Sequence, residues 1–172
     1  MPRLDLGSGL LIPGILILDT GPIWELVLYN AVNQFRFASL RPSLTHFVSI
    51  EAYEHCGTFL ASFRKKTTSA SVVAQLYNFI RGTEKRGQRQ LWELVYEEFR
   101  RMDMNEDVVK LLDMDLDLIA KYGPTDVSLI EIAVRNFSQN PVILTLDSPL
   151  HSECRKARIR SRLLIDVCNP IS

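Results

Sequence analysis

Two runs of apolar residues dominate the hydropathy pattern of the chain, and each ends in an aspartate. The first covers residues 14–18 and is followed by Asp19, and the second covers residues 141–146 and is followed by Asp147. A continuous apolar run of this length is typical of a strand that is buried on both faces of a parallel sheet. We therefore predict that both runs, with their terminal aspartates, are central strands.

Between these runs, apolar residues recur at the spacing of an amphipathic helix over several segments. The pattern predicts helices over 23–32, 50–63, 72–80, 88–101, from Asp103 or Asn105 toward Lys121, 126–136 and 149–160, with further strands over 65–68 and 163–167. Ser69 or Ser71 is the expected N-cap of the third helix, and Gly82 its expected end. Strands that alternate with helices indicate an α/β fold with a parallel, doubly wound sheet.

Composition narrows the class of protein. The 172 residues suit one domain, with 47% apolar and 23% charged residues, as in an ordinary globular protein. Twenty basic and twenty acidic residues give a formal net charge of zero. This balance excludes a globally basic nucleic-acid binder and leaves room for a local basic patch.

Cysteines and the N-terminal apolar stretch bear on the compartment. The three cysteines are scattered and form no C-x-x-C pair, so the sequence supports neither a zinc ribbon nor a disulfide framework. Residues 10–18 are too few to span a bilayer and are interrupted by Pro13-Gly14. Without a basic leading region or cleavage site they do not resemble a signal peptide. We expect a cytoplasmic protein with no membrane segment.

Three aspartates carry the candidate chemistry. Asp19 and Asp147 end the two central strands, and Asp126 opens the helical segment 127–136. Ligands of open α/β sheets gather beyond the carboxyl ends of the strands, so these three side chains can converge. Three carboxylates in one crevice repel one another unless a cation lies between them, and oxygen ligands suit Mg²⁺ or Mn²⁺.

Each aspartate also has a simpler interpretation when it is taken alone. Asp19 and Asp147 are acceptable turn residues. Asp126 is most simply a helix N-cap whose carboxylate accepts the free N–H groups of the first turn. Only the set of three, in this order along the chain, indicates a shared metal site.

The residues around these aspartates resemble the PIN-domain nuclease family. The resemblance rests on three segments: Ile15-Leu16-Ile17-Leu18-Asp19-Thr20-Gly21-Pro22, Gly123-Pro124-Thr125-Asp126-Val127-Ser128-Leu129-Ile130 and Leu144-Thr145-Leu146-Asp147-Ser148. The pattern is an aspartate after the first strand, a Thr-Asp that opens a late helix, and a Thr-x-Asp after the following strand. Order and spacing both fit over roughly residues 14–168.

The resemblance implies a compact three-layer α/β/α fold with a central, mainly parallel sheet, over residues 14–168. Residues 1–13 would form a leader and 169–172 a tail. It also implies Mg²⁺- or Mn²⁺-dependent cleavage of RNA, with Asp19, Asp126 and Asp147 as catalytic metal ligands. Many bacterial members are VapC-like toxins, so an antitoxin partner and a homodimer are further expectations. The sequence between about 33 and 67 is longer than in a typical small toxin.

One residue departs from the family pattern. The family places a glutamate early in the helix after the second strand, and Gln75 occupies that place here. An amide oxygen can coordinate a metal or orient a water, but it brings no charge, so we expect weakened metal binding. Glu51 and Glu54 are candidate substitutes, although they precede the matching segment.

Several polar and basic residues complete the expected site. Thr20, Thr145 and Ser148 are expected to support it through their hydroxyl groups. Arg155, Lys156 and Arg158 belong to a basic cluster that continues to Arg162 and would attract a phosphate backbone. A second basic stretch covers 81–89. The sequence contains no run of interleaved aromatic residues that would predict a base-stacking platform.

Three functions remain open from the sequence. The first is a metal-dependent endoribonuclease, the toxin of a toxin–antitoxin pair being one form. The second is a catalytically impaired PIN fold that binds RNA or a protein, which Gln75 motivates. The third is a hydrolase of small phosphoesters that uses the same metal.

Overall fold

The computed structural model describes residues 12–34, 46–47, 49–83 and 85–169. Of the predicted leader over 1–13, residues 1–11 lie outside the described part, and strand β1 already begins at Ile12. Residues 170–172 of the predicted tail also lie outside it. The same holds for 35–45 and 48 of the long stretch between 33 and 67.

The described strands form one five-stranded sheet in which all neighbours are parallel, in the order β3-β2-β1-β4-β5. The strands are β1 (Ile12–Leu18), β2 (Phe63–Ser69), β3 (Met104–Asp107), β4 (Val142–Thr145) and β5 (Arg160–Leu163). The two strands predicted from apolar runs are the neighbouring strands β1 and β4. The expected parallel sheet is therefore confirmed.

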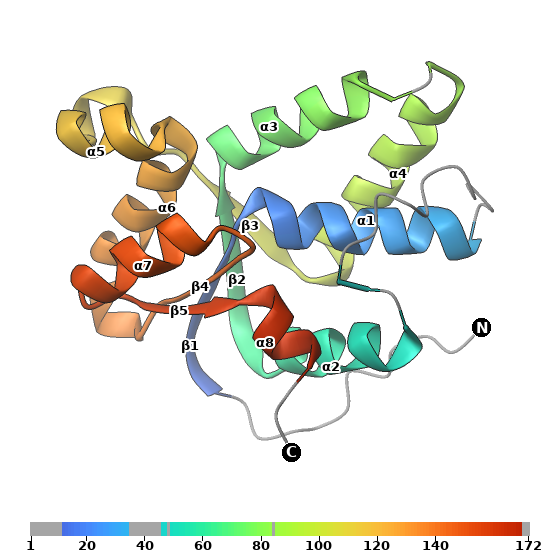
Figure 1. The fold of residues 1–172 in the computed structure, drawn as a ribbon, viewed down its shortest axis with the longest axis horizontal. Coiled ribbons are helices and arrows are strands. Elements are labelled where there is room, and N and C mark those ends of the chain that lie inside the picture. Colours follow the sequence, from blue (N-terminus) through green and yellow to red (C-terminus); the bar gives the residue numbers. More distant parts are fainter. Residues whose placement is uncertain (1–11, 35–45, 48, 84, 170–172) are drawn as a thin grey trace.

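Helices lie on both sides of this sheet (Figure 1). They are α1 (Thr20–Gln34), α2 (Ile50–Ala61), α3 (Ala70–Arg81), α4 (Lys85–Arg101), α5 (Leu116–Tyr122), α6 (Pro124–Arg135), α7 (Ser148–Lys156) and α8 (Leu164–Cys168), with single 3-10 turns at Leu111–Asp113 and Phe137–Gln139. Figure 1 places α1 and α4 on one side and α6 and α7 on the other. None of the described helices is long and apolar enough to cross a bilayer.

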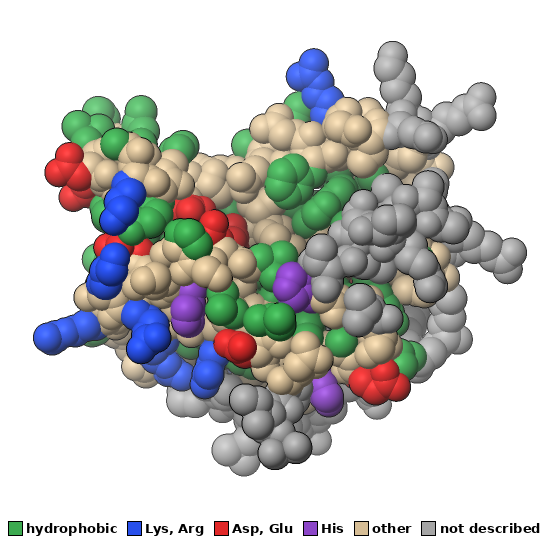
Figure 2. All heavy atoms as spheres, viewed as in Figure 1, with side chains coloured by type: hydrophobic (Ala, Val, Ile, Leu, Met, Phe, Trp, Pro, Cys, Tyr) green, Lys and Arg blue, Asp and Glu red, His purple; other side chains and the backbone are tan. Residues whose placement is uncertain are grey.

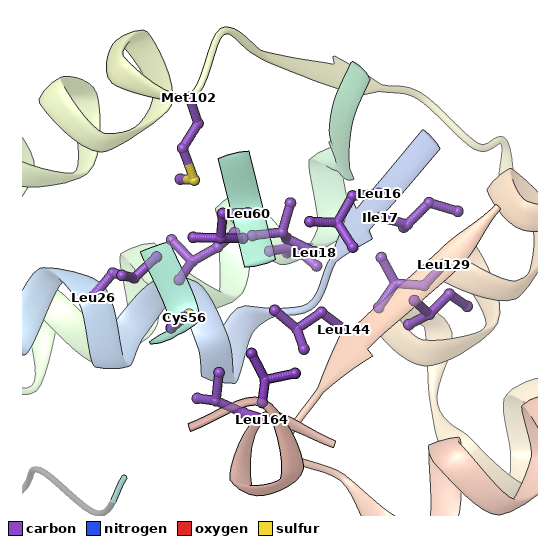
Figure 3. Packing of buried hydrophobic residues seen from close by; sticks show 14 of the residues in the cluster. Leu16, Ile17, Leu18, Leu26, Cys56, Leu60, Met102, Leu129, Leu144 and Leu164 are labelled. Atoms are coloured by element: carbon purple, nitrogen blue, oxygen red, sulfur yellow. The ribbon is translucent and has the colours of Figure 1, made fainter. Parts of the chain in front are cut away.

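The core lies where β1 meets the helices of both sides (Figure 3). Leu16, Ile17 and Leu18 are completely buried, and they pack with Leu26 of α1 and Leu129 of α6, among others. Burying a side chain of this size stabilises a fold by roughly 1.5–3 kcal/mol. The second half of the central strand, from Ile15 to Leu18, is thus held by apolar contacts directly before Asp19.

The predicted helix from Asp103 or Asn105 toward Lys121 is wrong in its first half. Residues 104–107 form the edge strand β3 instead, which pairs with β2 from Lys66↔Met104 to Ser69↔Asp107. A 3-10 turn follows, and only Leu116–Tyr122 is helical, with Asp115 as its N-cap. β3 has no buried residue, so its strand conformation comes from pairing and leaves no apolar signature in the sequence.

The last predicted strand is shifted. We expected a helix over 149–160 and a strand over 163–167, whereas α7 ends at Lys156 and β5 covers Arg160–Leu163. The apolar run after β5 is the short helix α8. Its buried residues, Leu164, Val167 and Cys168, are spaced three and one apart, as one face of a helix requires.

Candidate functional site

The ends of β1 and β4 are adjacent, and this brings two of the three aspartates to one edge of the sheet. The Asp19 N–H donates to the Leu144 carbonyl at 3.0 Å, so the hydrogen-bond ladder of β1 and β4 continues to the aspartate itself. Asp147 lies two residues beyond the end of β4. In a parallel sheet all carboxyl ends point the same way, and this edge is therefore the place where a ligand site is expected.

Asp19 is buried, with only 7% of its surface exposed, and both of its carboxylate oxygens accept hydrogen bonds. The Thr20 N–H donates to Oδ1 at 2.6 Å, and the hydroxyl of Thr145 donates to Oδ2 at 2.6 Å. Both predicted supporting threonines thus contact Asp19. Their bonds fix the orientation of the carboxylate at the end of β1.

Thr145 also links Asp19 to Asp147. Its hydroxyl oxygen accepts the Asp147 N–H at 2.8 Å while its proton is directed to Asp19. Asp147 in turn caps α7, because its Oδ1 accepts the Leu150 N–H at 2.7 Å. Asp147, which taken alone was expected to be a turn residue, therefore caps α7 through one oxygen, and no donor among the described residues reaches its other oxygen.

The turns after β1 and β4 pack closely against each other. A Cβ atom on Gly21 would lie 2.8–3.0 Å from three side-chain atoms of Leu146, nearer than side chains approach one another. Only glycine leaves room for Leu146 there. The Gly21 of the Asp-Thr-Gly-Pro segment thus sets how closely the Asp19 and Asp147 turns approach.

Asp126 reaches the same edge from α6. It lies in the first turn of the helix. The prediction that Asp126 is the N-cap is wrong, because the N-cap is Gly123, whose φ of +84° favours glycine. The hydroxyl of Ser128 donates to Ser69 Oγ at 2.7 Å, which ties α6 to the end of β2. Among the described residues no hydrogen-bond donor reaches the Asp126 carboxylate.

The three carboxylates are close enough for their charges to act on one another. Burial raises the pKa of Asp126 to about 7, and the negative charges of Asp19 and Asp147 add to this rise. Burial also raises the pKa of Asp19, where the hydrogen bonds from Thr145 and Thr20 oppose the rise and the charge of Asp147 adds to it. Raised carboxylate pKa values of this kind mark a site that would gain from a cation.

The carboxylate oxygens of the three aspartates are suitable ligands for a hard divalent ion, but the three side chains are not arranged around a common position for one. Asp126 has both oxygens available, and Asp147 has one. Within the described ranges, however, no three acidic, histidine or cysteine side chains are grouped closely enough to hold a metal ion together. An ion shared by all three aspartates would have to draw their side chains closer than they stand.

Gln75 faces the site from α3. The Thr20 hydroxyl donates to its amide oxygen, so the residue at the expected glutamate position contacts the neighbour of Asp19. The proposed substitutes Glu51 and Glu54 are exposed on α2. Burial raises the pKa of Tyr29, and the negative charges of Glu54 and Glu51 raise it further, so both glutamates lie near Tyr29. Tyr29 itself is about 14 Å along α1 from Thr20. Neither glutamate can replace Gln75 at the site.

The predicted RNA-binding residues lie away from the carboxylates. Arg155 and Lys156 are in the last turn of α7, about 12 Å along the helix from Asp147, and Arg158 follows in a left-handed turn with φ of +58°. Arg160 and Arg162 are exposed on the edge strand β5 rather than at a helix end. Ser148 is exposed as the first residue of α7.

Four helices of nine or more residues begin at this edge, as does the short α8 after β5, and the sequence analysis did not identify this feature. The first residues of α1, α3, α6 and α7 follow β1, β2, Gly123 and Asp147. Their unpaired N–H groups carry partial positive charge, which favours anions such as phosphate. The alternation of strands and helices was the available signal, because in a parallel sheet each helix that follows a strand begins at the carboxyl edge.

Figure 2 shows acidic side chains gathered in the hollow between the α5–α6 side of the molecule and α3. Comparison with known proteins adds no family: no protein-family profile matches the chain, and no curated protein matches it. The case for a function therefore rests on the geometry of this edge.

Proposed function

We propose that the chain is a divalent-metal-dependent ribonuclease with a PIN-like fold. The observation that supports the proposal is that Asp19, Asp126 and Asp147 lie near the same carboxyl edge, where the two charges that act on Asp126 are both negative. A structural ion pair would place a cation of the protein beside them. Carboxylates collected without one are suited to a metal ion from solution.

The chain's own residues have definable tasks in phosphodiester hydrolysis. Asp19, Asp126 and Asp147 would hold the ion, which on binding supplies charge neutralisation and activates a water. Thr145 holds Asp19 and the Asp147 backbone at fixed positions. The N-termini of α3 and α6 favour the negative charge of the phosphate. No covalent intermediate is required.

The fold is compatible with this assignment. An all-parallel sheet in the order 3-2-1-4-5, with helices on both sides, corresponds to the three-layer arrangement that the family resemblance implies. The resemblance further suggests a toxin that is restrained by a small antitoxin protein and that forms a homodimer. Growth arrest on expression, relieved by one co-expressed neighbouring protein, would support the toxin role.

A direct test combines metal binding with cleavage. Mn²⁺ binding by calorimetry and cleavage of a mixed-sequence RNA should both be present in the native chain and lost in Asp19→Asn. Asp117→Asn is the matched control, because Asp117 is an exposed carboxylate on α5. Cleavage by Asp19→Asn at the native rate, from preparations free of contaminating nuclease, would refute the proposed metal site.

A second candidate function is a PIN-like module that binds RNA or protein without cutting. It is favoured by the neutral amide of Gln75, engaged by Thr20, and by the open spacing of the carboxylates. Gln75→Glu discriminates between the two. Activity in the native chain supports the enzyme, activity only in Gln75→Glu identifies a disarmed nuclease, and inactivity in both supports the binding module. Hydrolysis of a simple phosphomonoester would instead indicate a small-molecule phosphatase.

A further inference from the structure

An aromatic pair lies directly beside the candidate site. Trp24 of α1 and Phe79 of α3 have ring centroids 5.7 Å apart, with an angle of 59° between the ring planes. Phe79 is 40% exposed, and Trp24 is partly exposed. The two residues are 55 positions apart in the chain, so a stacking surface formed by this pair could not be predicted from the sequence.

Helices α1 and α3 connect this pair to the candidate site, because each helix carries one residue of the polar contact and one of the two rings. Thr20 and Gln75 contact each other next to Asp19. Trp24 and Phe79 are each four residues further along the same helices, which is slightly more than one helical turn, or about 6 Å. Side chains four apart share a helix face, so the aromatic surface continues from the polar contact. Figure 2 shows apolar side chains exposed between α1 and α3, next to the acidic hollow.

We propose that this pair binds an unpaired base of a single-stranded nucleic acid whose neighbouring phosphate lies at the carboxylate site. The inference rests on the proposed nuclease function. Half-exposed aromatic rings are the usual stacking platforms for splayed bases, and they accept every base because each has a π-face. The helix N-termini at the same edge favour the phosphate. Bases held inside a duplex cannot reach such a platform.

The chemistry of the surface favours a nucleic acid over a protein segment. A protein helix would need a groove with several apolar anchor positions. Here the aromatic pair adjoins carboxylates and a threonine–glutamine contact, and the neighbouring helix position Asn78 is exposed and polar. A small aromatic surface beside a group of polar side chains corresponds to one nucleotide, with a base and its phosphate.

Binding can be measured on the whole chain in Ca²⁺ buffer, with a short single-stranded oligouridine and the corresponding duplex. Phe79→Ala should weaken single-strand binding by about 5- to 100-fold, the range expected for loss of one stacked base. Phe79→Tyr should restore it to within about twofold. Tyr96→Ala is the matched control, because Tyr96 is a more exposed aromatic residue, on α4.

A spectroscopic signal reports stacking separately from affinity. The chain has two tryptophans, so Trp92→Phe leaves Trp24 as the single emitter and keeps a ring against Tyr77. Oligouridine should quench Trp24 emission, and the duplex should not. Unchanged emission at saturation, or native affinity in Phe79→Ala, would overturn the inference and assign the pair to a protein partner or to packing alone.

The outcome is separable from that of the proposed function. If the native chain binds Mn²⁺ and cleaves RNA, and Phe79→Ala cleaves with unchanged KM, the stacking site is refuted and the nuclease stands. If oligouridine quenches Trp24 but Mn²⁺ binding and cleavage are absent, the nuclease is refuted and the stacking site stands.

Discussion

The two buried carboxylates Glu98 and Asp19 have opposite electrostatic surroundings. Glu98 is 5% exposed and Asp19 is 7% exposed, so both have lost most of their water. Glu98 lies between α1 and α4, where Arg101 donates two hydrogen bonds to its Oε2 and Asn30 donates one to its Oε1. Asp19 receives only neutral donors, and its charged neighbour is another aspartate.

The difference separates a structural carboxylate from a candidate functional one. A buried negative charge that the fold needs for packing is matched by a cation of the same chain. At the carboxyl edge the chain instead gathers three carboxyl groups, and the pKa values of Asp19 and Asp126 are raised. Such an arrangement lowers the stability of the ion-free protein, and it is best explained by a ligand that restores the balance.

The largest expected effect comes from breaking the ion pair between Arg101 and the buried Glu98. Arg101→Ala leaves Glu98 buried without its cation and should lower the free energy of unfolding by about 3 kcal/mol, since the guanidinium is itself partly exposed. Urea denaturation at constant pH measures this loss. Arg89→Ala, which removes the exposed pair with Glu93, should cost under about 1 kcal/mol. Equal losses in both variants would contradict the distinction drawn above.

The next largest effect is expected from removing a hydrogen bond at Asp19, the carboxylate beside which the described part of the chain places no cation. Thr145→Val removes the donor to the buried Asp19 carboxylate and the acceptor of the Asp147 N–H, which should cost about 2 kcal/mol and weaken Mn²⁺ binding. Thr68→Val is the matched control, because the buried Thr68 hydroxyl donates only to the Leu18 carbonyl. Thermal melts should show similar destabilisation in both variants. Mn²⁺ titrations should show weakened metal binding only in Thr145→Val.

A smaller effect is the pH dependence of stability without metal. Folded Asp126 holds its proton until about pH 7, whereas the unfolded chain releases it near 3.8. The folded state therefore binds more protons between these values, and stability should fall as pH rises from about 4 to about 7, then level off. After solvent screening we expect about 1 kcal/mol. Denaturation in EDTA across this range, repeated with Asp126→Asn, measures it.

Asp126→Asn should flatten this fall, and excess Mn²⁺ should reverse it by binding the ionised form. A metal-free protein whose stability rises steadily over the same range would show that the carboxylates are compensated after all.

The smallest effect concerns the distant basic cluster. If Arg155 contacts a single-stranded substrate only through phosphate, Arg155→Ala should reduce the salt slope of oligonucleotide binding by about 0.7 and leave cleavage at saturating substrate unchanged. Anisotropy titrations at several salt concentrations measure the slope. An unchanged slope would show that Arg155 does not contact the phosphate backbone of the substrate.

The sequence predicted those parts of the fold that are encoded by continuous apolar burial. β1 and β4 each have three or more fully or nearly fully buried residues in succession, so their strands and their terminal aspartates could be located. The cap at Ser69 and the end at Gly82 were also predicted, because both depend on local hydrogen bonding. Local chemistry and core burial are readable without knowledge of the fold.

The parts that were missed depend on tertiary contacts. β3 consists of Met104-Asn105-Glu106-Asp107 and is a strand only because β2 supplies partners. β5 alternates exposed arginines with partly buried residues, and the more apolar run after it drew the prediction three residues too far. At the site, the Thr20–Gln75 contact and the Trp24–Phe79 pair join helices that are 55 residues apart, which periodicity alone cannot predict.

The bond between Thr145 and Asp19 spans 126 positions of the chain. During synthesis, β1 must therefore wait for nearly all of the described domain to emerge before β4 can pair with it and the aspartates can meet. A ribosome carrying a partial chain would hold Asp19 without the groups that orient it. The topology thus delays assembly of the acidic edge until the domain is almost complete.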